Sequence, residues 1–353
     1  QALPHLPHRD GQVVTRAGVD MFWRAIDPGD YRLDYHYQPD GTPRGRMDFT
    51  LDFAAPGAPV NAPRGTVLLL HGWMMDGSSL LPWALQLAQA GYRTVSIDLR
   101  NHGRSGAAPA GYGTRESEDI VEVVAALRAR GEISGPLHVM GVSYGAATAI
   151  FSARALGDEV QGVIAMESFE NAGHAIRDMV PHMLDSAPET LVQQFSLRLM
   201  RWRFDAQALE TAISSASDTL ALPLDGVDVG GVLAQVPACV LLIHGDQDRH
   251  VPVAHGRALA AAAPRAHYLE VHGEDHISLP MRLDLLGPTV IDWLDSTGHG
   301  RVGHGRIGHG GGNPAGATTA GVPSTYCANP LAIAWAGVAV AVLAPRVGAA
   351  PAP

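Results

Sequence analysis

Short apolar runs alternate with helical patterns through the middle of the chain, from residue 65 to residue 294. The runs are rich in β-branched residues and lack strict polar alternation, which is typical of strands that are covered on both faces of a sheet. They lie at residues 66–70, 94–97, 137–140, 160–166, 240–243 and 267–271. Between them lie helical patterns such as residues 114–130. This alternation predicts an α/β fold with a doubly wound, mostly parallel sheet.

The interval between the runs ending at residue 166 and beginning near residue 238 is too long for one crossover helix. It is largely helical by pattern, especially over residues 187–216. We therefore expect an inserted helical cap at about residues 169–230, over the carboxyl ends of the strands. Its apolar side chains can form an acyl or aryl pocket or simply pack the cap on the core. They are Phe169, Met179, Met183, Leu184, Phe195, Leu199, Met200, Trp202 and Phe204.

The two ends of the chain have a different pattern from this central domain, which we place at residues 64–296. Residues 1–63 are rich in Pro, Gly and charge, and strand-like stretches at 31–37 and 47–53 flank a Pro-Asp-Gly turn signal. These features predict an edge hairpin behind a mobile N-terminal arm. Residues 297–353 form a low-complexity tail of Gly, His, Ala and Pro, with a tandem five-residue repeat at 298–312.

The tail contains two patterns that resemble functional motifs. Its G-x-G-x-x-G strings have neither a strand before them nor a helix after them, so we exclude a dinucleotide site. Its repeat histidines, His299, His304 and His309, suit a solvated tract better than a metal site. The apolar stretch at 331–343 has 13 residues, fewer than the roughly 20 that span a bilayer. Docking on the core and contact with a membrane surface both stay open, and we favour a tail without membrane contact.

Composition removes several classes of function. The 353 residues include 46% hydrophobic ones, which is enough for a large core, and the formal net charge is -10. That charge argues against a nucleic-acid partner, because phosphate binding needs clustered basic side chains. All 25 basic residues are Arg. The absence of Lys from the sequence excludes a Schiff-base lysine, a lysine general base and a P-loop lysine.

Two cysteines, Cys239 and Cys327, are too few for a disulfide framework. Cys239 lies in an apolar run, so we expect it to be an inert packing residue. The chain begins at Gln1, which allows a removed leader and slightly favours a secreted or periplasmic protein over a cytoplasmic one. The oligomeric state stays open.

A G-x-S-x-G string at residues 141–145 follows one apolar run and precedes a helical segment of small residues. This is the strand–turn–helix setting of a serine nucleophile, here Ser143. The two glycines allow close approach, because a side chain at either position would collide with a neighbouring strand or helix. The following helix points its positive dipole end at the serine.

A serine hydroxyl needs a base, and the base needs a carboxylate. His276 lies in a polar loop after the last strand-like run and is favoured over nearby His272. Two carboxylates follow the run at 240–243, and we favour Asp248 as the acid and interpret Asp246 as a turn residue that caps its own backbone. Glu167, at the end of the run at 160–166, is the alternative acid.

The negative oxygen of a tetrahedral intermediate needs preorganised donors. The residue after the nucleophile, Tyr144, supplies one backbone N–H. The second is expected from the loop after the run at 66–70, where we assign the Trp73 backbone N–H. We expect His71 in the same loop to be structural.

These motifs together resemble those of the α/β-hydrolase superfamily. The strings are HGW at 71–73, DLRNHGRS at 98–105, GVSYG at 141–145, HGDQD at 244–248 and GEDH at 273–276. The order Ser, Asp, His is the order of that superfamily, and the resemblance covers roughly residues 60–296. The string at 98–105 is similar to that of small acyl esterases, and the resemblance implies a structural role for it.

The resemblance and the residues together predict an ester hydrolase that works through an acyl-enzyme. We expect uncharged esters of short to medium acyl chain, because the flexible Met and aromatic side chains of the cap suit an acyl pocket. No metal or cofactor is expected. Hydrolysis of amides or carbon–carbon bonds and perhydrolysis stay open as alternatives, and so does a non-catalytic binding protein on this fold.

Overall fold

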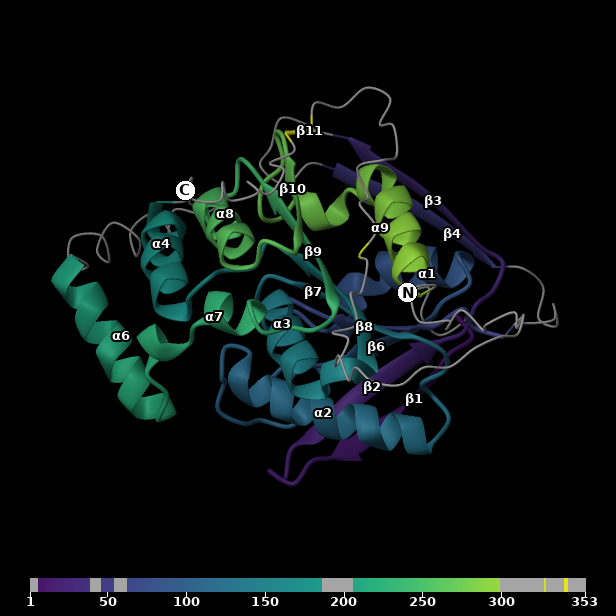
Figure 1. Cartoon of the computed structure of the whole chain (residues 1–353), viewed down its shortest axis with the longest axis horizontal. Coiled ribbons are helices and arrows are strands. Elements are labelled where there is room, and N and C mark those ends of the chain that lie inside the picture. The colour runs from purple at the N-terminus through teal and green to yellow at the C-terminus, as the bar shows by residue number, and fades with distance from the viewer. Residues whose placement is uncertain are drawn as a thin grey trace, which may run out of the picture.

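A computed structural model describes residues 6–38, 46–53, 62–185, 206–298, 327 and 340–341 of the chain. Its main sheet has nine strands in the order β1-β2-β6-β5-β7-β8-β9-β10-β11 (Figure 1). The pairings from β6 through β5, β7, β8 and β9 to β10 are parallel, and the pairings at both edges are antiparallel. The predicted α/β fold with a mostly parallel sheet is thus confirmed.

The central strands match the apolar runs of the sequence closely. Three of them, β5 (Thr66–Leu70), β8 (Val160–Met166) and β10 (His267–Val271), have the predicted bounds. The others extend the predicted runs by a few residues: β6 (Arg93–Ile97), β7 (Leu137–Val142) and β9 (Cys239–Gly245). In β5, Leu68 and Leu70 face one core, while Val67 and Leu69 face the other. Both faces are covered, which is why the sequence showed no polar alternation.

Helices pack on the two faces of the sheet as separate layers (Figure 1). One layer contains α2 (Thr114–Ala129), α3 (Tyr144–Leu156), α7 (Val229–Leu233) and α8 (Val253–Ala262). The other contains α1 (Leu81–Gln89) and α9 (Leu283–Gly298). Short 3-10 turns complete the elements: η2 (Gly77–Leu80), η3 (Gly157–Glu159), η4 (Leu224–Gly226) and η5 (Leu279–Met281).

The long interval between β8 and β9 contains α4 (Ala172–Asp185) and α6 (Ala206–Leu220) before η4 and α7. Both helices lie at one end of the molecule in Figure 1. Leu209 and Ile213 of α6 form a small separate core with Leu224. Five of the predicted cap side chains, from Phe195 to Phe204, lie outside the described residues, as does most of the helical pattern at 187–216.

The N-terminal region differs from the expected mobile arm. Strands β1 (Arg9–Val14) and β2 (Asp20–Ile26) form a hairpin that pairs with β6 and so extends the main sheet. Met21 and Trp23 are buried in the core, and this burial holds the hairpin in place. The predicted hairpin is present as β3 (Tyr31–Gln38) and β4 (Arg46–Phe53), but the two strands form a sheet of their own and not an edge of the main sheet.

The interpretation of Cys239 as only a packing residue is wrong, because Cys239 of β9 and Cys327 form a disulfide. The two cysteines are 88 residues apart in the sequence, so no local pattern indicated this pairing. A two-residue strand, β11 (Val340–Ala341), lies beside β10. The repeat at 298–312 with its three histidines, both G-x-G-x-x-G strings and most of the apolar stretch lie outside the described residues. None of the described helices has the length and apolar character needed to cross a membrane.

Candidate active site

Ser143 lies at a sharp turn between β7 and α3, where the chain changes from strand to helix. Its φ of 53° is in the left-handed region, which costs a non-glycine residue of order 1–3 kcal/mol. Two bonds hold the turn: the Ser143 N–H donates to Met166 O at 2.8 Å, and Ser143 O accepts from the Ala146 N–H at 2.9 Å. These bonds fix the backbone of the turn that carries the Ser143 side chain.

The two glycines that flank Ser143 are required by close packing. A Cβ on Gly145 would lie 2.2 Å from Leu70 O, at the end of the neighbouring strand β5. A Cβ on Gly141 would lie 2.1 Å from Gly145 O, within the turn itself. Both distances are far below any real contact, so the structure bears out the steric reason for the two glycines.

His276 joins Ser143 to Asp248 through a chain of two hydrogen bonds. Its Nε2 lies 3.0 Å from Ser143 Oγ, and its Nδ1 lies 2.6 Å from Asp248 Oδ2. The three side chains come from loops at the carboxyl ends of β7, β9 and β10. The three residues that the sequence selected are thus brought together, with the imidazole between the hydroxyl and the carboxylate.

The surroundings of Asp248 favour its charged form. Its Oδ1 accepts hydrogen bonds from the backbone N–H groups of His250 and Val251, both at 2.8 Å. Burial raises its pKa, but hydrogen bonds from His244 and His276 outweigh burial and hold the pKa well below its usual range. Asp248 is therefore an anion that fixes the Nδ1–H tautomer of His276 and leaves Nε2 to accept a proton.

The neighbouring Asp246 has a different role from the one predicted. Its carboxylate does not cap its own turn but reaches the loop after β10, where it accepts the Gly273 N–H at 2.8 Å. Its other oxygen lies 2.7 Å from Nδ1 of His272, the histidine that competed with His276 in the sequence. This pair ties the β9 and β10 loops together on the surface.

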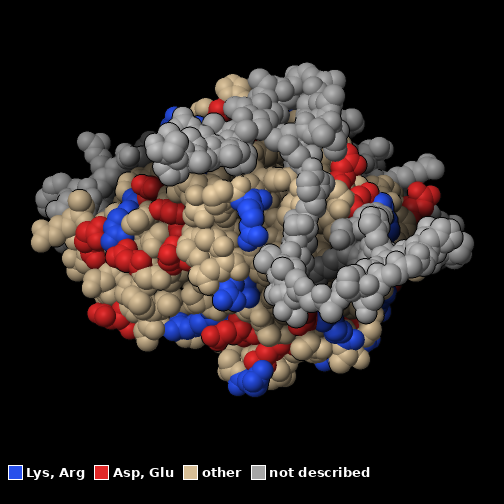
Figure 2. Space-filling view, in the orientation of Figure 1, with Lys and Arg blue, Asp and Glu red and all other residues tan. Residues whose placement is uncertain are grey.

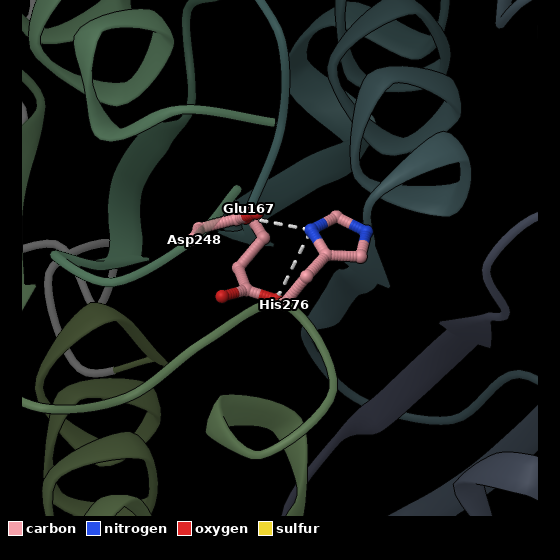
Figure 3. A group of neighbouring side chains, drawn as sticks. All are labelled: Glu167, Asp248 and His276. Atoms are coloured by element: carbon pink, nitrogen blue, oxygen red, sulfur yellow. Dashed lines mark hydrogen bonds and ion pairs between the residues drawn. The ribbon is translucent and has the colours of Figure 1, made fainter. Parts of the chain in front are cut away.

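Glu167, the alternative acid, lies beside the same imidazole (Figure 3). Its Oε2 is 3.5 Å from His276 Nδ1, and its side chain is fully buried. Glu167, Asp248 and His276 form the group of described residues whose ligand atoms are close enough for a metal ion. A metal at Nδ1 would displace the proton that joins His276 to Asp248, so we interpret the group as a hydrogen-bonded one.

The loop after β5 passes directly against Ser143. A Cβ on Gly72 would lie 3.9 Å from Ser143 Cβ, and Trp73 follows at once. His71 is buried, and its Nε2 accepts the Leu99 N–H at 2.9 Å while its Nδ1 lies 2.8 Å from Gly72 O. His71 thus shapes the loop, as expected. Trp73 and Ser143 line the same cavity, and Tyr144, the first residue of α3, directly follows the serine.

The string at 98–105 supports this loop from behind. Asp98 Oδ1 accepts the Gly77 N–H at 2.7 Å, and its Oδ2 accepts the Arg104 N–H at 2.8 Å. Asn101 has a φ of 65°, a conformation that asparagine tolerates better than most residues. These contacts agree with the structural role that the sequence resemblance implied for the segment.

An apolar cavity of about 190 Å³ opens beside Ser143 and His276. Met179 and Met183, two of the predicted cap side chains, line it from α4, whereas Phe169 is buried in the main core. Sequence reasoning missed other lining residues: His250, whose ring lies 5.3 Å from that of His276, and three further methionines. The Met74-Met75 pair directly after Trp73 was a signal that could have been used. Five of the ten methionines line the cavity: Met74, Met75, Met179, Met183 and Met281.

The chain is similar in sequence to several bacterial proteins. It is 27% identical over 246 residues to the uncharacterized protein YqkD of Bacillus subtilis, which covers 68% of this chain and 73% of that protein. It is 30% identical over 233 residues to a pimeloyl-[acyl-carrier protein] methyl ester esterase of Xanthomonas campestris pv. campestris, with 60% and 87% covered.

Solved structures agree at the level of the fold. The esterase Pf2001 of Pyrococcus furiosus superposes with a TM-score of 0.56 at 16% identity, over 84% of this chain and 94% of that one. A model of the alpha/beta hydrolase family matches residues 67–284, a range that holds Ser143, Asp248 and His276 together. With its strand order, its turn at Ser143 and this match over more than half of its length, the chain belongs to the alpha/beta hydrolase family.

Proposed function

We propose that the protein is a serine hydrolase that cleaves carboxylic esters through an acyl-enzyme, with Ser143 as nucleophile, His276 as base and Asp248 as the carboxylate that orients the base. The observation that carries this proposal is the hydrogen-bond chain from Ser143 Oγ through His276 to Asp248, at 3.0 and 2.6 Å. Ser143 and His276 of this chain both line the apolar cavity. One of the relatives is a methyl ester esterase, which supports the same reaction class.

Acylation begins when Ser143 Oγ attacks the ester carbonyl carbon and its proton passes to His276 Nε2. Asp248 stabilises the imidazolium that forms, because it is held as an anion by two backbone N–H groups. The tetrahedral intermediate then collapses as the C–O bond to the alcohol breaks. His276 returns its proton to the leaving alkoxide, and the acyl group stays on Ser143.

The oxyanion of the intermediate is stabilised by the backbone N–H groups of Trp73 and Tyr144. Tyr144 begins α3, so its N–H carries the positive end of the helix dipole. Trp73 follows His71 and Gly72 in the loop that passes against Ser143, which supports its assignment as the second donor. In the second half of the reaction, water attacks the acyl carbon and loses its proton to His276. The bond between that carbon and Ser143 Oγ then breaks to release the acid, and His276 returns the proton to Ser143 Oγ.

The substrate class follows from the cavity. Its lining is largely apolar, and the five methionines adapt to acyl chains of different shape. The described residues that line it include no arginine, so we infer that the acyl chain is uncharged and of short to medium length. In this proposal α4 is part of a cap, because Met179 and Met183 form one wall of the cavity.

We do not expect a nucleic-acid partner. On the described part of the face in Figure 2, acidic and basic side chains lie side by side and do not form a broad basic surface. Several of the arginines are engaged in ion pairs, such as Arg100 with Asp119 and Arg257 with Glu270. The proposed partner is a small ester. The proposed chemistry uses side chains, backbone N–H groups and water.

The test is the intact mass of the protein after treatment with a fluorophosphonate, followed by rates on p-nitrophenyl esters of increasing chain length. We expect one adduct on the wild type, no adduct on Ser143→Ala, and a fall in kcat of about 10⁶-fold in that variant. Rates should rise with acyl length until the cavity is filled and then fall.

Ser152→Ala is the matched control, since it makes the same change at a buried position of helix α3, which follows Ser143. It should keep the adduct and the ester rates. A folded wild type that takes up no fluorophosphonate would overturn the proposal and would favour a binding protein on this fold.

A further inference from the structure

The acid side of His276 has two carboxyl groups rather than one. We propose that Glu167 is a positioning residue for His276 that stays neutral while Asp248 is ionised, and that it orients the imidazole when the charge of Asp248 is removed. This inference rests on the proposed function, in which His276 is the base. It deepens that function because it assigns a role to a residue that the proposed mechanism does not use.

The two carboxyl groups have opposite surroundings. Asp248 accepts two backbone N–H groups as well as the imidazole, so its charge is well stabilised. Within the described part of the chain, neither oxygen of Glu167 has a hydrogen-bond partner, although its side chain is fully buried. An ionised carboxylate in such a place would cost several kcal/mol, so Glu167 is the neutral acid when Asp248 is charged.

The backbone holds Glu167 in this place at a cost. Its φ is 54°, in the left-handed region, as at Ser143, and such strain persists only where the surrounding structure imposes it. The Glu167 N–H donates to Ile243 O of β9 at 2.8 Å, which turns the end of β8 toward the loops that carry Asp248 and His276. The lack of a side chain on Gly245 leaves room for Glu167 Oε1, which would lie 3.3 Å from a Cβ there.

The charges around Glu167 explain why it responds to Asp248. Burial raises its pKa first, and the negative charges of Asp248, Asp275 and Glu274 raise it further. The Gly245 amide lowers the pKa of Glu167, but burial and these negative charges outweigh it. His276 Nδ1 lies 3.5 Å from Glu167 Oε2, and His244 Nε2 lies 3.5 Å from Asp248 Oδ2. Among these negative charges, Asp248 raises the pKa of Glu167 most, so removal of Asp248 lowers that pKa.

After that removal, Glu167 can ionise and accept the Nδ1–H of His276. The bond needs its Oε2 to close from 3.5 Å to about 2.8 Å, which is a movement of less than 1 Å. A side chain at position 248 without polar atoms leaves the space for this shift. Glu167 then fixes the same tautomer that Asp248 fixes in the wild type.

The experiment is a double-mutant cycle of Glu167→Gln, Asp248→Ala and the two together. We expect Glu167→Gln alone to keep kcat/KM within about 3-fold, since a neutral carboxamide resembles a neutral acid in shape and charge. Asp248→Ala should lose about 10²-fold and the double variant about 10⁴-fold, close to the value for a triad without its carboxylate. Asp248→Ala and the double variant both lose the hydrogen bonds from the His250 and Val251 N–H groups to Asp248, so this loss cancels when the two variants are compared.

Two further readouts separate this role from a merely structural one. The rate of Asp248→Ala should rise with pH as Glu167 ionises, and this limb should be missing from the double variant. The ¹⁵N signals of His276 should report the Nδ1–H tautomer in Asp248→Ala and lose it in the double variant. If the glutamine variant does not fold, Glu167→Met fills a similar volume without a polar atom and replaces it in the cycle.

The inference is overturned if Asp248→Ala and the double variant have the same rate, pH profile and His276 signals. It is also overturned if Glu167→Gln alone is as impaired as Asp248→Ala, because Glu167 would then be ionised in the wild type. The NMR readout needs no turnover. A protein that took up no fluorophosphonate would end the proposed function, while the His276 signals would still decide the role of Glu167.

Discussion

Glu116 is a buried carboxylate near the candidate site that serves stability rather than chemistry. Its Oε1 accepts the Gly111 N–H at 2.8 Å and the Tyr144 O–H at 2.6 Å, and its Oε2 accepts the Gly113 N–H at 2.8 Å. All three hydrogen-bond donors therefore face a carboxylate oxygen of Glu116. The residue thereby joins the start of α2 to Tyr144, whose backbone we assign to the oxyanion site.

Glu116→Gln should therefore lower the free energy of unfolding by about 1–3 kcal/mol, because the amide nitrogen must face one of these buried N–H or O–H donors. Chemical denaturation followed by circular dichroism measures this. Glu118→Gln, an exposed change on the same helix, is the control and should have no measurable effect. Equal stability of the two variants would contradict this account of Glu116.

The sequence indicated the individual site residues well where a local motif carried them. Ser143 was evident because two glycines and a strand–helix change surround it within five residues. Glu167 was found only as an alternative acid, since its isolation depends on three separate loops that meet around it. The role predicted for Asp246 was wrong for the same reason, because its partners His272 and Gly273 come from a different loop.

At the scale of elements, α4 is held to α8 by a charged cluster under the cavity wall. His255 of α8 is almost fully buried; its Nδ1 pairs with Glu170, and its Nε2 lies 2.9 Å from Asp178 of α4. Burial lowers the pKa of His255, but hydrogen bonds to the two carboxylates outweigh it and raise the pKa above 6.5. Burial likewise raises the pKa of Glu170, and the hydrogen bonds from His255 and His174 lower it to about 2.

The stability that this cluster contributes should depend on pH in both directions. The contribution of His255 is complete below pH 6.5 and is lost as the pH rises through its raised pKa. The contribution of Glu170 is complete above pH 4.5 and is lost as the pH falls toward 2. We expect the free energy of unfolding of the wild type to exceed that of His255→Gln by about 1–2 kcal/mol between these limits, and by less outside them.

Urea unfolding of both proteins across this pH range measures the difference. His174→Gln is the control: its side chain is mostly exposed and it contacts the same Glu170, so its effect should be small at every pH. A difference between wild type and His255→Gln that stays constant with pH would show that the imidazole acts by packing and not by charge.

How well the sequence predicted a strand depended on how fully that strand is buried. The inner strands were predicted almost to the residue, because burial on both faces leaves an unbroken apolar run. Strand β1 was missed because it lies at an edge and only Val13 of its six residues is buried. Strand β2 has buried Met21, Phe22 and Trp23, but the surrounding Pro, Gly and charged residues suggested an arm.

On the scale of the whole molecule, the disulfide ties the C-terminal region to the core. Cys239 is buried in β9, and Cys327 packs against the core beside it. Disulfides persist in oxidising compartments and are rare in the cytosol. This pairing therefore adds support to our proposal of a secreted or periplasmic protein, which the sequence alone only slightly favoured.

The prediction at this scale is that the oxidised protein has no titratable thiol and loses stability on reduction. A disulfide that closes a loop of this length typically contributes about 2–4 kcal/mol, so a reductant should lower Tm by about 5 °C or more. Cys327→Ser should have the Tm of the reduced wild type and should not respond to reductant, and the double variant with Cys239→Ser should match it. Two free thiols in protein recovered from an oxidising compartment, or a Tm that reductant does not change, would contradict the cross-link, and the proposed compartment would lose this support.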